Sequence, residues 1–476
     1  MDSKKVLDIF REITRIPRES GHEEQIVSFL QQFAREHSLE SRTDEAGNVV
    51  IVKEAAPGCE NLPVIVLQSH SDMVCEKNSG VEHDFSKDPI NYVIEDGWMI
   101  AKDTTLGADC GIGMAAQLAV LTDETPSGRI ECLFTVSEET GLYGAKALKP
   151  GFISGKILIN LDSEDEGELF VGCAGGMDTA AVFRYNTVPV AEGSKLALIR
   201  VCNCAGGHSG DDIDKGRANA VQLLARFLYS HPELQICSLD GGNKSNAIAR
   251  EAEAVAAVAD TEVGSLKAAV QAFGSDLKAE YAVGDPDVRV ELRVEEFPAG
   301  LQAVDPDVAR AVVTALFAAP HGVLAMSGDI PGLVETSTNL ASVKMPEKGV
   351  IRVGTSQRSS VDTERRAAGL KVEAAFRLAG AEVTHESEYP GWKPNMDSAL
   401  LKVCVESYRR LFGTEPVVRA IHAGLECGLF LDTFPELDMI SFGPTLRGVH
   451  APGERLDLAS LDKFVALLED VILHIR

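Results

Sequence analysis

The hydrophobic pattern of the chain is marked by short runs of apolar, largely β-branched residues that end abruptly at polar side chains. The first run lies in residues 62–72, LPVIVLQSHSD, and stops at His70 and Asp72. Such a run is typical of a strand that is buried on both faces inside a parallel sheet. Three further runs end in the same way, at residues 130–136, 156–161 and 438–442.

The residues that follow these four runs are of the types that bind metal ions. In open α/β sheets, ligands bind beyond the carboxyl ends of the strands. We therefore expect one edge of a sheet to gather the side chains His70, Glu138, Glu139, Asp162 and, from the loop after the fourth run, His450. A carboxylate two residues after His70, that of Asp72, is placed to orient the imidazole.

The remaining pattern predicts one discontinuous domain with an insertion. Up to about residue 185, helices and strands alternate. From about 190 to 385 the strands and helices follow an order that is typical of an α+β unit, and after 386 the first pattern returns. We predict an α/β catalytic domain, with a mixed, mostly parallel sheet flanked by helices, and an inserted α+β lid. The predicted boundaries are 1–187 and 388–476 for the catalytic domain and 188–387 for the lid.

Composition narrows the class of protein. The chain has 476 residues, of which 45% are hydrophobic and 25% charged, as in a soluble globular protein. Its net charge of −27 argues against nucleic acid or an anionic membrane as a partner. The start is a charged, amphipathic helix capped by Asp2 or Ser3 rather than a signal peptide. The ten cysteines contain no CxxC pair, so we expect free thiols in a reducing, cytoplasmic compartment.

Charge balance favours a metal centre if the carboxylates converge. Two carboxylates about 4 Å apart repel by roughly 4 kcal/mol at an effective dielectric constant of 20. Two divalent ions would balance the charges of Asp109, Glu139 and Asp162 together with one bridging hydroxide. Histidine ligands favour zinc over magnesium, although Mn²⁺ and Co²⁺ also suit nitrogen and oxygen ligands.

Each of these residues also has a plainer interpretation. His70 and Asp72 suit an ordinary hydrogen-bonded pair at a strand end, and Asp109 suits a helix N-cap. Adjacent glutamates at 138 and 139 suit a solvated turn. The glycines of residues 104–113 lack the strand–GxGxxG–helix order of a nucleotide site and suit a tight loop. A structural protein, however, has no reason to end four buried strands at such side chains.

Six motifs, in this order, resemble the aminoacyl-histidine dipeptidase family, which also includes cytosol non-specific dipeptidases and belongs to the zinc peptidases. The resemblance covers essentially the whole chain. The motifs are His70-Ser71-Asp72-Met73-Val74, Thr105-Leu106-Gly107-Ala108-Asp109, Ser137-Glu138-Glu139-Thr140-Gly141, Asn160-Leu161-Asp162, Gly206-Gly207-His208-Ser209-Gly210 and His450.

The resemblance implies two zinc ions that are bridged by Asp109. It implies His70 and Asp162 as the other ligands of one ion, and Glu139 and His450 as those of the second. It further implies a cis peptide bond after Asp109.

The catalytic roles are likewise implied by the resemblance. Glu138 is the implied general base for a hydroxide bound to the two ions, and Asp72 orients His70. His208 in the lid is implied to stabilise the oxyanion. Asn246, Arg250 and Arg358 are expected to bind the substrate's carboxylate, and Glu426 its free amino group.

The expected activity is hydrolysis of dipeptides, including Xaa-His dipeptides such as carnosine. An alternative is a deacylase or carboxypeptidase of the same fold that acts on N-acyl amino acids. A non-catalytic binding protein is disfavoured because Glu138 stands intact beside Glu139. We expect a homodimer, although a lid of two related units would supply His208 within one chain.

Overall fold

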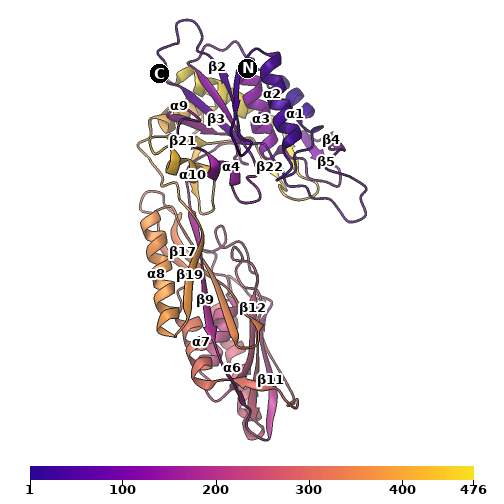
Figure 1. Ribbon diagram of the computed structural model, residues 1–476, viewed down its shortest axis with the longest axis vertical. Helices are drawn as coiled ribbons and strands as arrows, with labels where there is room; N and C mark the ends of the chain where they lie inside the picture. The colour runs from indigo at the N-terminus through magenta and orange to yellow at the C-terminus, as the bar shows by residue number, and fades with distance from the viewer. The chain divides into compact units, whose positions relative to one another are not determined.

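The computed structural model describes residues 1–476 and divides into two compact units. The first unit comprises Met1–Cys173, Trp392–Ala420 and Leu425–Arg476, and the second comprises Ala174–Gly391 and Ile421–Gly424. Both chain ends belong to the first unit (Figure 1). The second unit therefore starts earlier than the predicted residue 188, because the strand that begins at Gly175 pairs with strands of the second unit.

An eight-stranded sheet forms the centre of the first unit. Its strand order is β1-β2-β6-β3-β7-β21-β8-β20. The strands are β1 (Glu40–Thr43), β2 (Val49–Lys53), β3 (Ile65–His70), β6 (Ile130–Thr135), β7 (Ile157–Asn160), β8 (Glu168–Cys173), β20 (Val417–Ile421) and β21 (Asp438–Ser441).

The four apolar runs of the sequence are the four central strands, which lie side by side in the order β6-β3-β7-β21. These four pair in parallel, so their carboxyl ends share one edge, as the sequence predicted. The sheet is mixed, because β1 with β2, β2 with β6 and β21 with β8 pair antiparallel. Strands nearer the edge are less enclosed, as in the mostly exposed β1, and antiparallel pairing tolerates that exposure.

Helices and a small second sheet complete the first unit. α1 begins after Asp2, whose side chain accepts a hydrogen bond from Lys4 N, and packs its apolar face on α3 and α11. Figure 1 shows α1, α2 and α3 beside β2 and β3. The helices are α1 (Ser3–Ile13), α2 (Glu24–Glu36), α3 (Ala108–Leu121), α4 (Tyr143–Ala147), α9 (Ala399–Phe412), α10 (Glu426–Thr433) and α11 (Leu458–His474). The four-stranded sheet contains β4 (Tyr92–Glu95), β5 (Trp98–Ala101), β22 (Leu446–Arg447) and β23 (Arg455–Asp457).

The second unit is built on a nine-stranded antiparallel sheet. Its main order is β14-β11-β13-β12-β17-β18-β9-β19, with β16 paired to β17. The strands are β9 (Gly175–Arg184), β11 (Ser194–Cys202), β12 (Gln235–Gly242), β13 (Ala252–Ala259), β14 (Arg289–Glu296), β16 (Gly322–Met326), β17 (Val334–Glu347), β18 (Val350–Ser359) and β19 (Glu382–Tyr389); β10 (Thr187–Pro189) and β15 (Gln302–Val304) pair separately.

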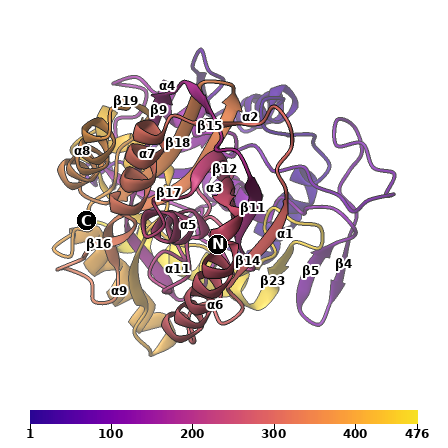
Figure 2. The same cartoon turned by 90° about the horizontal axis from the view of Figure 1, so that it is seen from below.

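Four α-helices pack on this sheet around a core that includes Phe183, Phe227 and Phe376. Figure 1 shows α8 running along β19 and β9, and Figure 2 shows α5, α7 and α8 grouped together. The helices are α5 (Ala220–Tyr229), α6 (Val263–Glu280), α7 (Pro306–Ala318) and α8 (Asp362–Leu378), with a short 3₁₀ turn η1 (Asp260–Glu262) before α6. None of the helices is long and apolar enough to cross a membrane, and all ten cysteines are free.

Candidate metal centre

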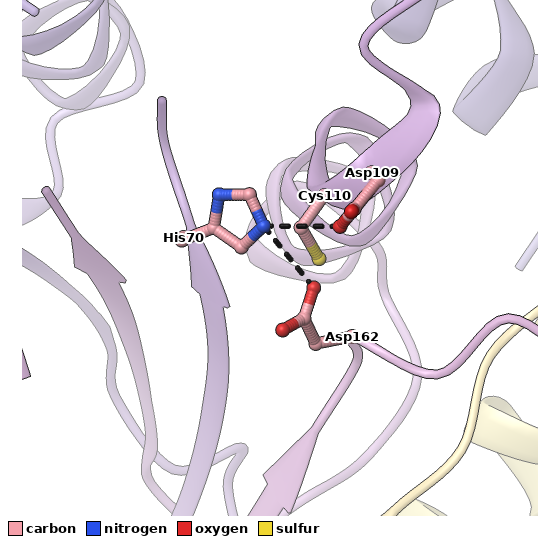
Figure 3. Close-up of side chains that lie close together, drawn as sticks. All are labelled: His70, Asp109, Cys110 and Asp162. Atoms are coloured by element: carbon pink, nitrogen blue, oxygen red, sulfur yellow. Dashed lines mark hydrogen bonds and ion pairs between the residues drawn. The ribbon is translucent and has the colours of Figure 1, made fainter. Parts of the chain in front are cut away.

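Three ligand-type side chains meet at the carboxyl edge of the first unit's sheet. His70 is the last residue of β3, Asp162 follows β7, and Asp109 stands in the first turn of α3. The Nε2 atom of His70 lies 3.0 Å from Asp109 Oδ1 and 3.3 Å from Asp162 Oδ1, as Figure 3 shows. One imidazole nitrogen and two carboxylates thus face a common point.

The other oxygen of Asp109 faces a second group of ligand-type side chains. Asp109 Oδ2 lies 3.1 Å from His450 Nε2, and that nitrogen lies 2.8 Å from Glu139 Oε1. Glu138 also reaches this region, because its carboxylate lies within 4.8 Å of ligand atoms of His70 and Glu139. The five residues that the sequence suggested as metal ligands therefore lie together, with Asp109 between two histidines.

The charges of this cluster are those of a site that takes up cations. Asp162 Oδ1 is buried and has no hydrogen-bond partner of good geometry. Burial, together with the charge of Asp109, raises the pKa of Asp162 to about 6. Hydrogen bonds to Asp109 and Glu139 raise the pKa of His450 to about 11. The buried carboxylates are thus neutralised in part by protons on their neighbours, and divalent ions would neutralise them instead.

Cys110 is a close neighbour of the cluster that was not expected to take part. Figure 3 shows its thiol beside His70 and Asp162. Its Sγ donates a hydrogen bond to the carbonyl oxygen of Leu161 at 3.3 Å, and burial raises the pKa of the thiol well above its usual value. The peptide bond between Asp109 and Cys110 is cis, as the resemblance implied.

Asp72 supports both His70 and the loop after β6. Its Oδ1 lies 3.4 Å from His70 Nδ1, which fixes the ring so that Nε2 points to the cluster. The two carboxylate oxygens accept hydrogen bonds from the backbone N–H groups of Glu138 and Glu139, at 3.0 and 3.2 Å. Burial opposes ionisation, but the hydrogen bond and charge of His70 and the hydrogen bond from Ser20 outweigh it and lower the pKa of Asp72 to about 2. Asp72 is therefore a carboxylate at neutral pH.

Glu426 lies within the first unit and is buried, with 1% of its surface exposed. Its Oε2 accepts hydrogen bonds from Gln68 Nε2 at 2.6 Å and Thr135 Oγ1 at 2.8 Å, whereas Oε1 has no hydrogen-bond partner. Burial raises its pKa to about 8. The carboxyl group expected to meet a substrate amine is thus enclosed between β3 and β6.

The four candidate residues of the second unit are connected through one loop. Ser209, next to His208, donates its N–H to the carbonyl oxygen of Asn246 at 2.8 Å, and its hydroxyl accepts from Arg358 Nε at 3.4 Å. Arg250 donates from Nε to the carbonyl oxygen of Cys204, in the strand-to-loop segment before this turn. His208, Asn246 and Arg250 are partly or fully exposed, whereas Arg358 is buried.

Arg18 and Glu454 are two further buried charged residues beside the cluster that sequence reasoning missed. Arg18 donates to the carbonyl oxygens of Asp72 and Gly107, and Glu454 accepts from the backbone around Asp109. Arg18 stands in a polar segment that precedes the second helix, and Glu454 follows His450 by four residues. Neither position carries a local signal of burial, because both are flanked by polar residues and glycine or proline.

Comparison with known proteins agrees with this geometry. Residues 66–474 match the model of peptidase family M20/M25/M40. The chain is 40% identical over 473 residues to the cytosol non-specific dipeptidase of Escherichia coli (strain K12), covering 98% of this chain and 97% of that protein. The crystal structure of aminoacylhistidine dipeptidase from Vibrio alginolyticus superposes with a TM-score of 0.92 at 38% identity, covering 99% of this chain and 96% of that chain.

A more distant structure shows the same fold. The aminopeptidase PepT from Bacillus cereus has a TM-score of 0.63 at 17% identity, covering 100% of this chain and 99% of that chain. The family match spans most of the chain, and the similarity to the Escherichia coli protein extends over almost all of both. The chain therefore belongs to peptidase family M20/M25/M40.

Proposed function

We propose that the chain is a dipeptidase that depends on two divalent metal ions. The observation that carries the proposal is the position of Asp109, whose two oxygens face His70 on one side and His450 on the other. His70 and Asp162 would hold one ion, Glu139 and His450 the second, and Asp109 both. Three carboxylates and two imidazoles suit Zn²⁺, and Mn²⁺ or Co²⁺ fit the same donors. The relatives named as dipeptidases support the substrate class.

Glu138 is the proposed general base. When bound, the ions would polarise the peptide carbonyl and lower the pKa of a water molecule. Burial and the negative charges of Asp162, Glu426 and Glu139 raise the pKa of Glu138 well above its usual value, so cations nearby would lower it again. The carboxylate of Glu138 would then take a proton from the attacking water and give it to the leaving amine.

The residues of the second unit are proposed to recognise the substrate. His208 would donate a hydrogen bond to the oxyanion that forms from the peptide carbonyl. Arg358, with Asn246 and Arg250, would bind the terminal carboxylate, and its contact with Ser209 supports a connection with the His208 loop. Glu426 would accept the substrate's ammonium group with Oε1, which has no hydrogen-bond partner.

The names of two relatives support proposals about the substrate and the location of the enzyme. We propose that its substrates include Xaa-His dipeptides such as carnosine, as the printed name of the Vibrio alginolyticus structure suggests. We also propose a cytoplasmic homodimer, in line with the name of the Escherichia coli relative for the location and with the sequence expectation for the assembly. Sedimentation of the purified protein measures the assembly directly.

Metal analysis combined with a panel of dipeptides tests the function. The metal-free protein, prepared with a chelator, is expected to hydrolyse no dipeptide, and two equivalents of Zn²⁺, Mn²⁺ or Co²⁺ per chain should restore the rate. The panel varies the second residue and includes each dipeptide with a blocked amino group. Hydrolysis of blocked and free dipeptides at equal rates would show a deacylase or carboxypeptidase instead, and activity that persists without metal would refute the proposal.

A further inference from the structure

Glu454 occupies a position that none of the proposed catalytic or binding roles explains. It is 2% exposed and follows β22 and the His450 loop. Its Oε2 accepts the N–H groups of Leu106 and Gly107 at 2.7 and 2.9 Å, and its Oε1 accepts those of Ala108 and Asp109 at 2.7 and 3.3 Å. Four consecutive backbone N–H groups thus converge on one buried carboxylate.

These four N–H groups lead directly into the first turn of α3. Gly107 provides no side-chain cap, and Asp109 and Cys110 have non-helical backbone angles, so residues 106–109 form an irregular turn before the regular part of the helix. The N–H groups of such a turn have no partner inside the helix. The carboxylate of Glu454 supplies that partner for all four N–H groups of the turn. Asp109 lies inside this turn, so its backbone position depends on Glu454.

The same residue also holds the loop that carries His450. The N–H of Glu454 donates to the carbonyl oxygen of Ala451 at 3.2 Å, and the N–H of Gly453 donates to that of Thr104 at 3.0 Å. His450 itself has a positive φ of 62°, a conformation that needs support from its surroundings. The loop of His450 is therefore joined to the loop of Asp109 by the Gly453–Thr104 hydrogen bond as well as by the Glu454 carboxylate.

A buried cation adds to this support. Arg18, 1% exposed, donates from Nη1 to the carbonyl oxygen of Asp72 at 2.7 Å and from Nη2 to that of Gly107. Gly107 has a φ of 68°, and a Cβ there would meet the buried Arg18 guanidinium, so both its backbone angle and this close approach favour glycine. Residue 107 thus donates to a carboxylate and accepts from a guanidinium, which fixes its peptide groups in one orientation.

We propose that Glu454 is a positioning residue of the metal centre, which holds the Asp109 carboxylate between His70 and His450 by accepting the N–H groups of residues 106–109. The inference rests on the proposed two-ion centre. Asp109 is the residue proposed to be shared by both ions, so a small displacement of its backbone weakens both sets of ligand contacts. Replacement of a residue that supports a metal ligand typically weakens metal affinity by about 10- to 100-fold.

The test compares Glu454→Gln with a matched control, Glu131→Gln. Glutamine offers one acceptor oxygen and turns an amide N–H₂ toward two backbone donors, so two of the four hydrogen bonds are lost. Glu131 is equally buried and also accepts backbone N–H groups, from Ser154 at 2.6 Å and Gly155 at 3.2 Å. It is the second residue of β6, near the strand end opposite to the metal centre.

Zinc binding to the purified full chain is measured by competition with a chromophoric chelator, and thermal unfolding is measured on the metal-free proteins. Glu454→Gln is expected to weaken binding of at least one of two Zn²⁺ ions by about 10- to 100-fold. Glu131→Gln is expected to lower the unfolding temperature but to bind Zn²⁺ as the unaltered chain does. Glu454→Asp keeps the charge but has a shorter side chain, so its zinc affinity should lie between those of the unaltered chain and Glu454→Gln. It replaces Glu454→Gln in the test if that variant does not fold.

Two results would overturn the assignment of Glu454. One is that both Glu454 variants bind zinc as tightly as the unaltered chain, and the other is that the Glu131 variant loses as much affinity as they do. A failure of the proposed function looks different, because the unaltered chain itself would then bind fewer than two Zn²⁺ ions, and that result would refute both proposals together.

Discussion

The two units hold their candidate functional side chains in different ways. In the first, His70, Asp109 and Asp162 stand at strand and helix ends, and buried groups such as Asp72 and Glu454 accept backbone N–H groups beside the ligand-type residues. Glu139 and the exposed His450 stand on loops that follow strands. In the second, His208, Asn246 and Arg250 stand on loops and are at least partly exposed, and Arg358 alone among the candidates is buried. Metal ligands must keep their distances within a few tenths of an ångström, whereas residues that bind a flexible dipeptide tolerate more movement.

This contrast assigns separate properties to the two units. Changes in the first should alter metal affinity or the chemical step, and changes in the second should alter substrate affinity with the metal content unchanged. Each of the following experiments measures metal content beside activity, so that the division between the units is tested in every case.

The largest effect is expected for Glu138→Gln in the first unit. The amide cannot accept the proton of the attacking water, so kcat should fall by about 10²- to 10⁴-fold. The metal content should stay at two ions per chain, since Glu138 is not a proposed ligand. Glu45→Gln, at an exposed site, is the control and should leave kcat unchanged. Full activity of Glu138→Gln would exclude this residue as the base.

The next largest effect is expected for Arg358→Ala in the second unit. Loss of a charged hydrogen-bond donor costs about 1.5–3 kcal/mol, so KM should rise by about 10- to 150-fold while the metal content is unchanged. Arg352→Ala is the matched control, because Arg352 lies on the same strand but is exposed. A loss of bound metal in Arg358→Ala would contradict the proposal that residues of the second unit affect substrate affinity alone.

Asp72→Asn should have a smaller effect, confined to the first unit. The amide nitrogen of the asparagine cannot accept a hydrogen bond, so the N–H of either Glu138 or Glu139 loses its partner. The neutral side chain also holds the His70 ring less firmly. Zinc affinity, measured by chelator competition, should fall by about 10- to 100-fold. Asp84→Asn, an exposed aspartate, should bind zinc normally. Equal zinc affinity of the two variants would show that Asp72 does not orient His70 for metal binding.

The smallest effect concerns the pH dependence of stability in the metal-free protein. Burial raises the pKa of Asp162 to about 6, of Glu164 to about 7 and of Glu426 to about 8. Between pH 5 and 8 these groups, together with His450, bind more protons in the folded than in the unfolded state. They outweigh His321 and His422, whose pKa values are lowered by burial and act in the opposite direction, so the free energy of unfolding falls as the pH rises. Urea unfolding in the presence of a chelator should show this decrease.

Two further samples sharpen that measurement. Glu426→Gln removes one of the groups with a raised pKa, so its stability should fall less between pH 5 and 8. The zinc-loaded protein should also show a flatter dependence, because the ions replace the protons. A metal-free protein that becomes more stable as the pH rises to 8 would contradict the account of the buried carboxylates.

Much of the first unit was predictable from local pattern. The four apolar runs form the parallel centre of the sheet, and Asp2 caps the first helix as expected. The start of the second unit was placed near residue 188 rather than at Ala174, because β9 follows β8 almost without a break in the apolar pattern. A run of apolar residues shows that a strand is buried but does not show which sheet it joins.

The sequence by itself determined the buried strands, the polar residues that end them and, through its motifs, the family. Only the tertiary structure decided that Glu454 meets the N–H of Asp109, 345 residues away, that Glu426 is enclosed, and that Arg358 is buried instead of solvated. The physical reason is that side-chain periodicity reports the burial of a segment, whereas the partners of a charged group come from distant segments that chain topology brings together.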